Sequence, residues 1–398
     1  MKNVILFDDT ATRDDLLPLT YTRPIADIRF GITTIRQKWE RAFKECKFSY
    51  FTTPYLQPKF RNAPSAESLF IAGHICPNAD LVAIIEELNT GEALLYNNEL
   101  IAFYGTLKEF KVRRFGKRIF LSTKPLGIRM LYDIFMFNDK AIIQDYKDLT
   151  IGRSSQVVGI SNHIIGNAFF PDGSPKIFIE AGAKVEGAYL NVNNGPIYIG
   201  KDAEIMEGSA IRAPFAACEH TMVNMGTKIY GATTIGPYSK VGGELNNVVI
   251  IGYSNKAHDG FLGNAVIGEW CNIGAGTNAS NLKNDYTEIK LWNYPAHRFL
   301  KTGLQFCGLI MGDHSKAGIN CMFNTATVIG VGVNIHGAGF PRNFVASFSE
   351  GSTAGFTDVS LPKFFNIAER VMARRNVSLS EIDRRIFESI YTIADTYK

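Results

Sequence analysis

Apolar residues recur at every sixth position through the middle of the chain, often with a glycine after them and a small residue before them. The longest runs are Ile199, Ile205 and Ile211, and Ile229, Ile235 and Val241, and the shorter runs are Ile151/Val157, Ile179/Val185, Ile267/Ile273 and Ile329/Ile335. A period of six matches neither the 3.6-residue period of a helix nor the two-residue period of a strand. It predicts a parallel β-helix over residues 149–345, in which each hexapeptide forms one short side of a triangular prism.

The residues on either side of this ladder follow other patterns. Residues 1–148 alternate short apolar runs with helical spacing, which predicts a small α/β domain. The expected elements are strands at 4–7 and 48–51, helices at 31–43 and 79–88, and a hairpin turn at 97–99. Residues 346–398 predict a helical tail, in which Ser378–Glu381 has the capping-box pattern of a helix start. We therefore expect three domains.

The composition excludes several classes of partner. The 398 residues carry a net charge of only +4, which indicates neither a nucleic-acid nor a membrane partner. No run of the sequence is long and apolar enough to span a bilayer. The six cysteines are scattered without a CxxC pair, which favours a reducing, cytoplasmic location. The densest basic stretch, residues 108–118, is typical of a solvated surface, and if functional it suits the phosphates of a nucleotide.

Common catalytic motifs are missing from the sequence. It has no P-loop pattern, no GxSxG nucleophile elbow and no HExxH zinc helix. A hexapeptide prism can hold a zinc-dependent carbonic anhydrase site, which needs three imidazoles. No two of the seven histidines have the spacing of zinc ligands, so the sequence leaves any metal unassigned.

The interruptions of the ladder carry the candidate chemistry. The period fails at 213–226, 278–305 and 312–320, and also around His258. Loops that leave a rigid solenoid are frequent places for ligand contacts. An imidazole that titrates near pH 7 suits a base that takes the proton from an amine or hydroxyl attacking a thioester. A structural role is the alternative interpretation of a single histidine.

The segment Asn255–Ala265 and the following Asn272–Thr277 resemble the acetyltransferase half of a known family. This is the bifunctional bacterial N-acetylglucosamine-1-phosphate uridyltransferase/glucosamine-1-phosphate N-acetyltransferase family. The resemblance implies that acetyl-CoA is a cosubstrate and glucosamine 1-phosphate the acceptor. It implies that His258 is the catalytic base and that Glu244, fourteen residues earlier, acts beside it. It also implies a left-handed β-helix that forms a homotrimer, with acetyl-CoA in the clefts between subunits.

The same resemblance assigns further contacts. Those to the sugar fall on Asn272, Asn281 and Phe261, that to its phosphate on Arg212, and those to acetyl-CoA on Ala275, Gly337 and Ala338. Phe261 stands where the family has a tyrosine, and Asn246 where it has a phosphate-binding lysine. Lys283 lies near the place of a second lysine. Either Arg212 and a nearby lysine hold the phosphate, or the acceptor differs.

The chain is similar to a variant group of this family, of the Bacteroidetes type, whose recurring stretches are matched at 17–24, 312–316 and 340–342. In that group the first domain is short and divergent. For the first domain here, the resemblance implies a divergent sugar-1-phosphate nucleotidyltransferase that takes UTP and Mg²⁺. The expected nucleotide contacts follow the first strand and are Asp8, Asp9, Arg13 and Arg23. This loop lacks the glycines that let backbone amides approach phosphates. A structural interpretation, in which the carboxylates end the strand and pair with the arginines, therefore stays open.

Three functions remain. The first is a bifunctional enzyme of UDP-N-acetylglucosamine synthesis, and the second is an acetyltransferase whose first domain is structural or regulatory. The third is a non-catalytic hexapeptide scaffold. Release of the CoA thiol separates the third function from the others, and pyrophosphate release from UTP separates the first from the second.

Overall fold

The computed structural model describes residues 3–398 and shows two compact units. The first unit ends at Met130, and the second comprises Arg29–Ile32 and Leu131–Lys398. Helices α5 (Asp133–Met136) and α6 (Asn138–Thr150) therefore belong to the second unit, whereas the sequence suggested a boundary at residue 148. The side chain of Asn138 gives the physical reason. Its amide nitrogen donates to the carbonyl of Ala232, and its oxygen accepts from the backbone of Gly31, both within the second unit.

The first unit contains a mixed sheet of six strands in the order β2–β1–β3–β5–β4–β6. The strands are β1 (Asn3–Phe7), β2 (Lys47–Phe51), β3 (Ser68–Ala72), β4 (Glu92–Tyr96), β5 (Glu99–Gly105) and β6 (Lys117–Phe120). The helices are α1 (Thr10–Asp15), η1 (Ile25–Asp27), α2 (Ile35–Ala42), α3 (Ala79–Glu86) and α4 (Leu107–Lys111). Strand β1 lies between β2 and β3 and pairs in parallel with both. Asp8 and Asp9 directly follow its carboxyl end.

The elements predicted for the first unit are largely confirmed. Strands at 4–7 and 48–51 and a helix beginning at Ala79 are present. The helix expected at 31–43 begins only at Ile35, because Thr34 caps it and Gly31 has a φ of +79°. Asn97 and Asn98 also have positive φ, which suits the tight turn between β4 and β5.

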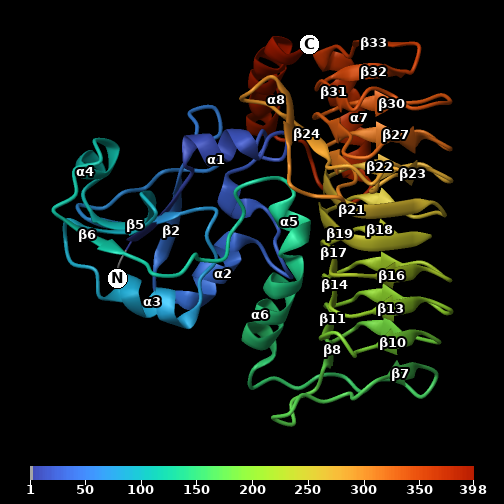
Figure 1. Cartoon of the computed structure of the whole chain (residues 1–398), viewed down its shortest axis with the longest axis horizontal. Coiled ribbons are helices and arrows are strands. Elements are labelled where there is room, and N and C mark those ends of the chain that lie inside the picture. The colour runs from blue at the N-terminus through green and yellow to red at the C-terminus, as the bar shows by residue number, and fades with distance from the viewer. Residues whose placement is uncertain (1–2) are drawn as a thin grey trace. The chain divides into compact units, whose positions relative to one another are not determined.

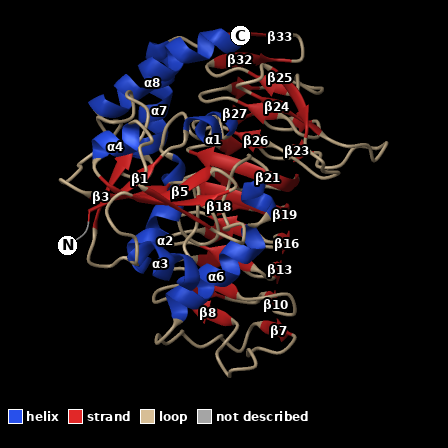
Figure 2. Ribbon diagram, turned by 60° about the vertical axis from the view of Figure 1, so that its left-hand side comes forward, coloured by secondary structure: helices blue, strands red, loops and turns tan. Residues whose placement is uncertain are grey.

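The second unit is a parallel β-helix whose short strands stack in three faces along one axis (Figures 1 and 2). Face 1 contains β7 (His163–Ile165), β10 (Tyr189–Asn191), β13 (Ala210–Arg212), β16 (Lys228–Tyr230), the first parts of β19 (Glu244–Gly252) and β21 (Phe261–Glu269), β23 (Asn278–Ala279) and β28 (Met322–Phe323). Face 2 contains β8 (Ile177–Ile179), β11 (Ile197–Ile199), β14 (Phe215–Ala217), β17 (Thr233–Ile235), the later parts of β19 and β21, β26 (Ile310–Met311), β29 (Val328–Ile329) and β31 (Phe344–Val345). Face 3 contains β9 (Lys184–Val185), β12 (Glu204–Ile205), β15 (Met222–Val223), β18 (Lys240–Val241), β20 (Asn255–Lys256), β22 (Asn272–Ile273), β27 (Lys316–Ala317), β30 (Asn334–Ile335) and β32 (Ser349–Ser352).

Two antiparallel pairs depart from these stacks. The excursion after β23 carries the hairpin of β24 (Lys290–Asn293) and β25 (Arg298–Lys301). The last strand of the unit, β33 (Gly355–Asp358), runs antiparallel to β32 at one end of the β-helix (Figure 1).

The ladder residues form the core of the β-helix, as predicted. One continuous buried cluster contains Ile199, Ile205, Ile211, Ile229, Ile235, Val241, Ile267, Ile273, Ile329 and Ile335. Ile151 and Val157 are the exception, since they are 81% and 91% exposed and lie in no strand. They precede the first stacked strands, so no earlier coil covers them, and their assignment to the ladder was wrong.

Two helices, α7 (Leu361–Ala373) and α8 (Glu381–Ala394), with the short η2 (Asp395–Tyr397), form the tail. The capping residue of α8 is Ser380, which bonds to the backbone of Asp383, rather than Ser378. The rings of Phe364 and Phe387 pack edge-on against His314 of the β-helix. The tail thus covers one part of the β-helix. Among residues 3–398, no helix is long and apolar enough to cross a membrane.

Candidate functional site

The corner between faces 3 and 1 holds His258. Ala257–Gly260 join β20 to β21 there, and we call these residues the His258 corner. In the preceding coil only Gly242 and Gly243 make the same connection. The longer corner leaves His258 exposed. The two coils are in contact, because the backbone N–H of Glu244 donates to the carbonyl of Gly260 at 3.2 Å, and Glu244 pairs in register with Phe261.

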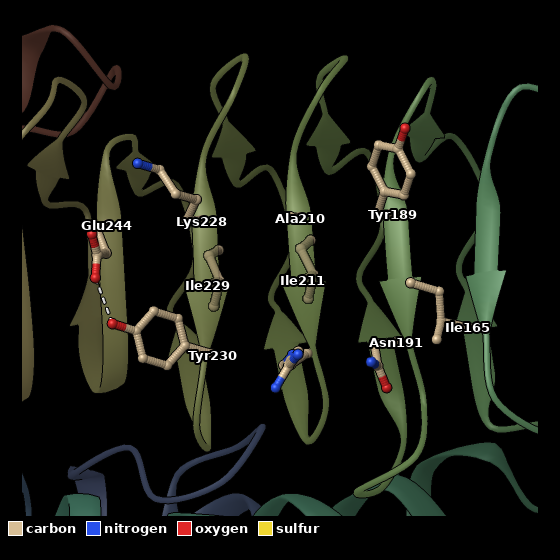
Figure 3. Close-up of a pocket in the computed structure, with 10 residues that line it drawn as sticks. Ile165, Tyr189, Asn191, Ala210, Ile211, Lys228, Ile229, Tyr230 and Glu244 are labelled. Atoms are coloured by element: carbon tan, nitrogen blue, oxygen red, sulfur yellow. Dashed lines mark hydrogen bonds between the residues drawn. The ribbon is translucent and has the colours of Figure 1, made fainter.

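Glu244 is held by a neighbouring tyrosine. The hydroxyl of Tyr230 donates to Oε1 of Glu244 (Figure 3). This hydrogen bond, with a smaller contribution from burial, raises the pKa of Tyr230 to about 12. The phenol therefore keeps its proton near neutral pH and remains a donor to the carboxylate.

A pocket of about 580 Å³ opens on face 1 beside this pair. Arg212, Lys228, Tyr230 and Glu244 line it together with Ile165, Tyr189, Asn191, Ala210, Ile211 and Ile229 (Figure 3). The structure thus brings Arg212 and Glu244, two of the expected site residues, into one pocket. It adds Lys228, which pairs in register with Glu244 and which the sequence analysis missed. Two exposed cations and one carboxylate at a single pocket suit an acceptor that carries a phosphate and a hydrogen-bond donor.

Two expected sugar contacts lie together one coil further on. A side chain at Gly263 would meet Cζ of Phe261 and Nδ2 of Asn281, each at 2.6 Å, so the ring and the amide both cover this glycine. The amide of Asn281 also donates to Oδ1 of Asn264 at 2.8 Å. Phe261 and Asn281 therefore form a small polar and aromatic group next to the coil of Glu244.

The other predicted sugar contacts lie elsewhere. Asn272 is an exposed residue of β22 on face 3 and lines no part of the face 1 pocket. Lys283 belongs to the excursion after β23, and its Nζ donates to the hydroxyl of Thr287 at 3.0 Å.

The residues expected to bind acetyl-CoA continue along the same edge of the β-helix. Ala275 lies at the corner that follows the His258 corner, and the two are joined by a bond from Gly276 N–H to the carbonyl of Asp259 at 2.9 Å. Gly337 and Ala338 follow β30 at a later corner and are exposed. His258, Ala275 and Gly337 thus mark one line of corners between faces 3 and 1.

In the first unit, Asp8 is buried at the end of β1. Its side chain is 3% exposed and accepts hydrogen bonds from the Thr52 hydroxyl and the Ile25 backbone. Burial raises the pKa of Asp8 to about 6, although these hydrogen bonds oppose the rise. Asp9 caps α1 by accepting from the backbone of Thr12.

Arg13 of α1 and Arg23, the two arginines expected to contact a nucleotide, are also buried. Arg13 donates to the carbonyl of Thr20 at 3.0 Å and to the hydroxyl of Tyr55 at 2.7 Å, and its Nε lies 3.9 Å from Asp8. Arg23 is 5% exposed. The contacts of Asp8 and Arg13 fit the structural interpretation of this loop.

The first unit has a pocket of about 650 Å³ that is lined by arginines other than Arg13 and Arg23. Arg113, Arg118 and Arg129 face it together with Asp9, Ala11, Thr12, Asp15, Leu95, Asn98, Glu99, Leu100, Phe115 and Met130. We call it the arginine pocket. Arg113 is anchored by the ring of Phe110, 5.5 Å from its guanidinium carbon, and lies 3.9 Å from Asp9.

Arg129 of this pocket is paired with Glu99. Burial alone would raise the pKa of Glu99, but hydrogen bonds from His74 and Arg129 lower it to about 2. Glu99 therefore stays ionised and engages Arg129. Of the three arginines that line the pocket, Arg113 and Arg118 are the two that a ligand can bind. Within residues 3–398, no cluster of three or more potential metal ligands occurs.

Comparison with known proteins relates the chain to transferases of two kinds. A family model for sugar nucleotidyl transferases matches residues 4–154. A curated relative, a bifunctional sugar-1-phosphate nucleotidylyltransferase/acetyltransferase from Sulfurisphaera tokodaii, is 28% identical over 190 residues. The match covers 47% of this chain and 44% of that protein, so the chain spans less than half the length of the relative. The family match and the relative support the expectation of an enzyme, with these two transferase activities as its general kind.

Two solved structures are more distant. A mutant of AntD, an N-acyltransferase from Bacillus cereus in complex with dTDP and coenzyme A, has 13% identity and a TM-score of 0.23, over 50% of this chain and 89% of that chain. A UDP-N-acetylglucosamine acyltransferase from Campylobacter jejuni has 13% identity and a TM-score of 0.17, over 56% and 83%.

Proposed function

We propose that the second unit is a left-handed β-helix acetyltransferase that moves the acetyl group of acetyl-CoA to the amine of glucosamine 1-phosphate. One observation carries this proposal. Glu244 shares a pocket with Arg212 and Lys228, and the His258 corner lies on the adjacent coil. The site thus offers a base, a carboxylate and two phosphate-binding cations within neighbouring coils.

In the proposed reaction, the imidazole of His258 takes a proton from the amine as the nitrogen attacks the thioester carbonyl. The C–N bond forms, the C–S bond breaks, and the CoA sulfur leaves as a thiolate that takes up the proton from the imidazolium. Glu244, held by Tyr230, accepts a hydrogen bond from the acceptor and orients it. Lys228 and Arg212 bind the sugar phosphate.

The remaining contacts lie on the neighbouring coils. The backbone around Ala275, Gly337 and Ala338 holds acetyl-CoA, and Phe261 and Asn281 contact the sugar. Asn272, on face 3, is not part of the proposed sugar site. Because His258 is exposed on the single chain, we propose that a homotrimer completes the site by placing a second subunit against this edge.

We propose further that the first unit is the nucleotidyltransferase, so that the whole chain makes UDP-N-acetylglucosamine in the cytoplasm. In the arginine pocket, Arg113 and Arg118 would bind the phosphates of UTP. Asp9 and Asp15 line the same pocket, and two carboxylates with phosphate oxygens and water are a donor set that suits Mg²⁺. The metal would neutralise the phosphates, and the carboxylates would hold it.

The burial of Arg13 and Arg23 favours a second candidate, an acetyltransferase whose first unit has only a structural or regulatory role. Two assays on the full chain decide. The bifunctional proposal predicts thiol release with acetyl-CoA and glucosamine 1-phosphate, and pyrophosphate release with UTP and N-acetylglucosamine 1-phosphate. Thiol release alone would leave the acetyltransferase, and neither activity would leave a non-catalytic scaffold.

A further inference from the structure

Lys256 stands where neighbouring coils of the β-helix have apolar core residues. It pairs in register with Val241 on face 3, and the inward positions before and after them are Val223 and Ile273. Lys256 is only 2% exposed. A buried ammonium group is unfavourable unless hydrogen bonds replace those it made to water, so Lys256 requires acceptors inside the β-helix.

The ammonium group bonds to two carbonyls at one corner. Nζ of Lys256 donates to the carbonyl oxygen of Gly242 at 3.1 Å and to that of His258 at 2.6 Å. The first acceptor lies at the corner of the preceding coil and the second in the His258 corner. Lys256 therefore ties the two coils together from inside. Burial lowers its pKa to about 8, and the nearby carboxylate of Asp259 opposes this change.

The peptide group on the other side of His258 is fixed as well. The amide nitrogen of Asn224 donates to the carbonyl of Ala257 at 2.7 Å. Thus the peptide before His258 is held by Asn224 and the peptide after it by Lys256. With both peptides fixed, only the side-chain torsions of His258 remain free to aim the imidazole. A long corner would otherwise leave these carbonyls without ladder partners.

We propose that Lys256 is a positioning residue for His258, whose buried ammonium group fixes the following peptide and so the direction of the imidazole. This inference rests on the proposed role of His258 as the base. Lys256 is buried beneath the corner and does not touch the acceptor or acetyl-CoA. Its loss should therefore lower kcat and leave the KM values of both substrates nearly unchanged.

The first test compares Lys256→Met with Ile273→Met, a control at the next rung of the same face. We expect kcat to fall about 10- to 100-fold in Lys256→Met, with both KM values within about twofold, because small misplacements of a base have effects of this size. The control should stay within about twofold of wild type. A Lys256→Met enzyme with wild-type kcat would overturn the proposal.

A double-mutant cycle separates positioning from general damage. If Lys256 acts through the imidazole, Lys256→Met should cause no further loss in a His258→Ala background. An equal loss in both backgrounds would mean that Lys256 only supports the fold, which contradicts the proposal. Lys256→Gln, which keeps one amide donor, allows the same comparison if the methionine variant does not fold.

Hydrogen exchange gives a result that does not depend on catalysis. The amide of Gly276 donates to the carbonyl of Asp259, the residue that follows the peptide fixed by Lys256. It should exchange at least about tenfold faster in Lys256→Met, while amides of β22 stay unchanged. Unchanged exchange at Gly276 would contradict the fixing of the His258 corner by Lys256, whatever the activity. Faster exchange in Lys256→Met, together with a fully active His258→Ala enzyme, would overturn the role of His258 and therefore also the positioning role inferred from it.

Discussion

Tyr230 donates a hydrogen bond to Glu244 across two neighbouring coils of face 1. The bond holds one carboxylate oxygen beside the pocket that Arg212 and Lys228 also line. Because Tyr230 keeps its proton near neutral pH, the carboxylate oxygens have a fixed donor on one side and remain open to the substrate on the other. The arrangement makes Glu244 an oriented acceptor rather than a mobile surface charge.

Replacing the tyrosine tests this arrangement. In Tyr230→Phe the carboxylate loses its donor, and hydrogen bonds to charged groups contribute about 1.5–3 kcal/mol. We expect kcat/KM for the acetyl acceptor to fall about 10- to 100-fold, with little change in the melting temperature. Tyr238→Phe, which removes a hydroxyl at a corner away from face 1, is the matched control and should remain active. Equal activity of the two variants would contradict a role for the Tyr230 hydroxyl.

Lys228 should recognise the phosphate of the acceptor. In Lys228→Gln we expect the KM for glucosamine 1-phosphate to rise at least about tenfold, since charge-assisted hydrogen bonds to phosphate are the strong ones. For glucosamine, which has no phosphate, the ratio of the thiol-release rates of the variant and the wild type should be close to one. Lys184→Gln, a change at an exposed lysine of β9 on face 3, serves as the control. A similar effect on both acceptors would show that Lys228 does not read the phosphate.

The group around Gly263 can be disturbed without unfolding the β-helix. A methyl group in Gly263→Ala would push the ring of Phe261 and the amide of Asn281, which are the ends of side chains and can move. We expect a higher acceptor KM and a melting temperature close to wild type. In Gly308→Ala the methyl would instead meet the backbone carbonyl of Gly263, so that variant should lose stability. Thermal unfolding together with acceptor kinetics distinguishes the two outcomes.

The raised pKa of Asp8 should make the stability of the first unit depend on pH. Its ordinary pKa of 3.8 is raised to about 6 by burial, so the folded state binds the proton more tightly than the unfolded state. Stability from this group is present below about pH 4 and is lost as the pH rises to about 6, an effect of about 3 kcal/mol. Hydrogen exchange of the β1 amides between pH 4 and 7 measures it. Asp8→Asn should flatten the profile, and parallel profiles for the two proteins would contradict the assignment.

The ladder could be predicted from sequence because burial of every sixth residue follows directly from the backbone of a β-helix. The pocket on face 1 could be predicted only in part. The coil between Lys228 and Glu244 is shorter than the coil between Ala210 and Lys228, so the register that places Lys228 next to Glu244 cannot be read from a constant period. Lys256 was hidden for a similar reason, since a lysine at a rung position looks like an interruption until its two carbonyl partners are known.

The first unit shows the opposite limit. The sequence suggested that Arg13 could bind a nucleotide, because it follows the first strand. Its hydrogen-bond partners are instead the carbonyl of Thr20 and the hydroxyl of Tyr55, which lies far away in the sequence. Such tertiary contacts are not visible in a local pattern. Arg113 and Arg118 belong to a basic stretch that is typical of a solvated surface, and only the fold brings them to a pocket with Asp9 and Asp15.

The most direct test of the account is thiol release from acetyl-CoA with glucosamine 1-phosphate by the full chain and by its His258→Ala variant. Loss of a catalytic base costs about 10²–10⁴-fold in rate, so the variant should lose this much while keeping its oligomeric state and melting temperature. His220→Ala, at an exposed histidine of another corner, should keep wild-type turnover. Near-normal turnover by His258→Ala would contradict the proposed acetyltransferase site.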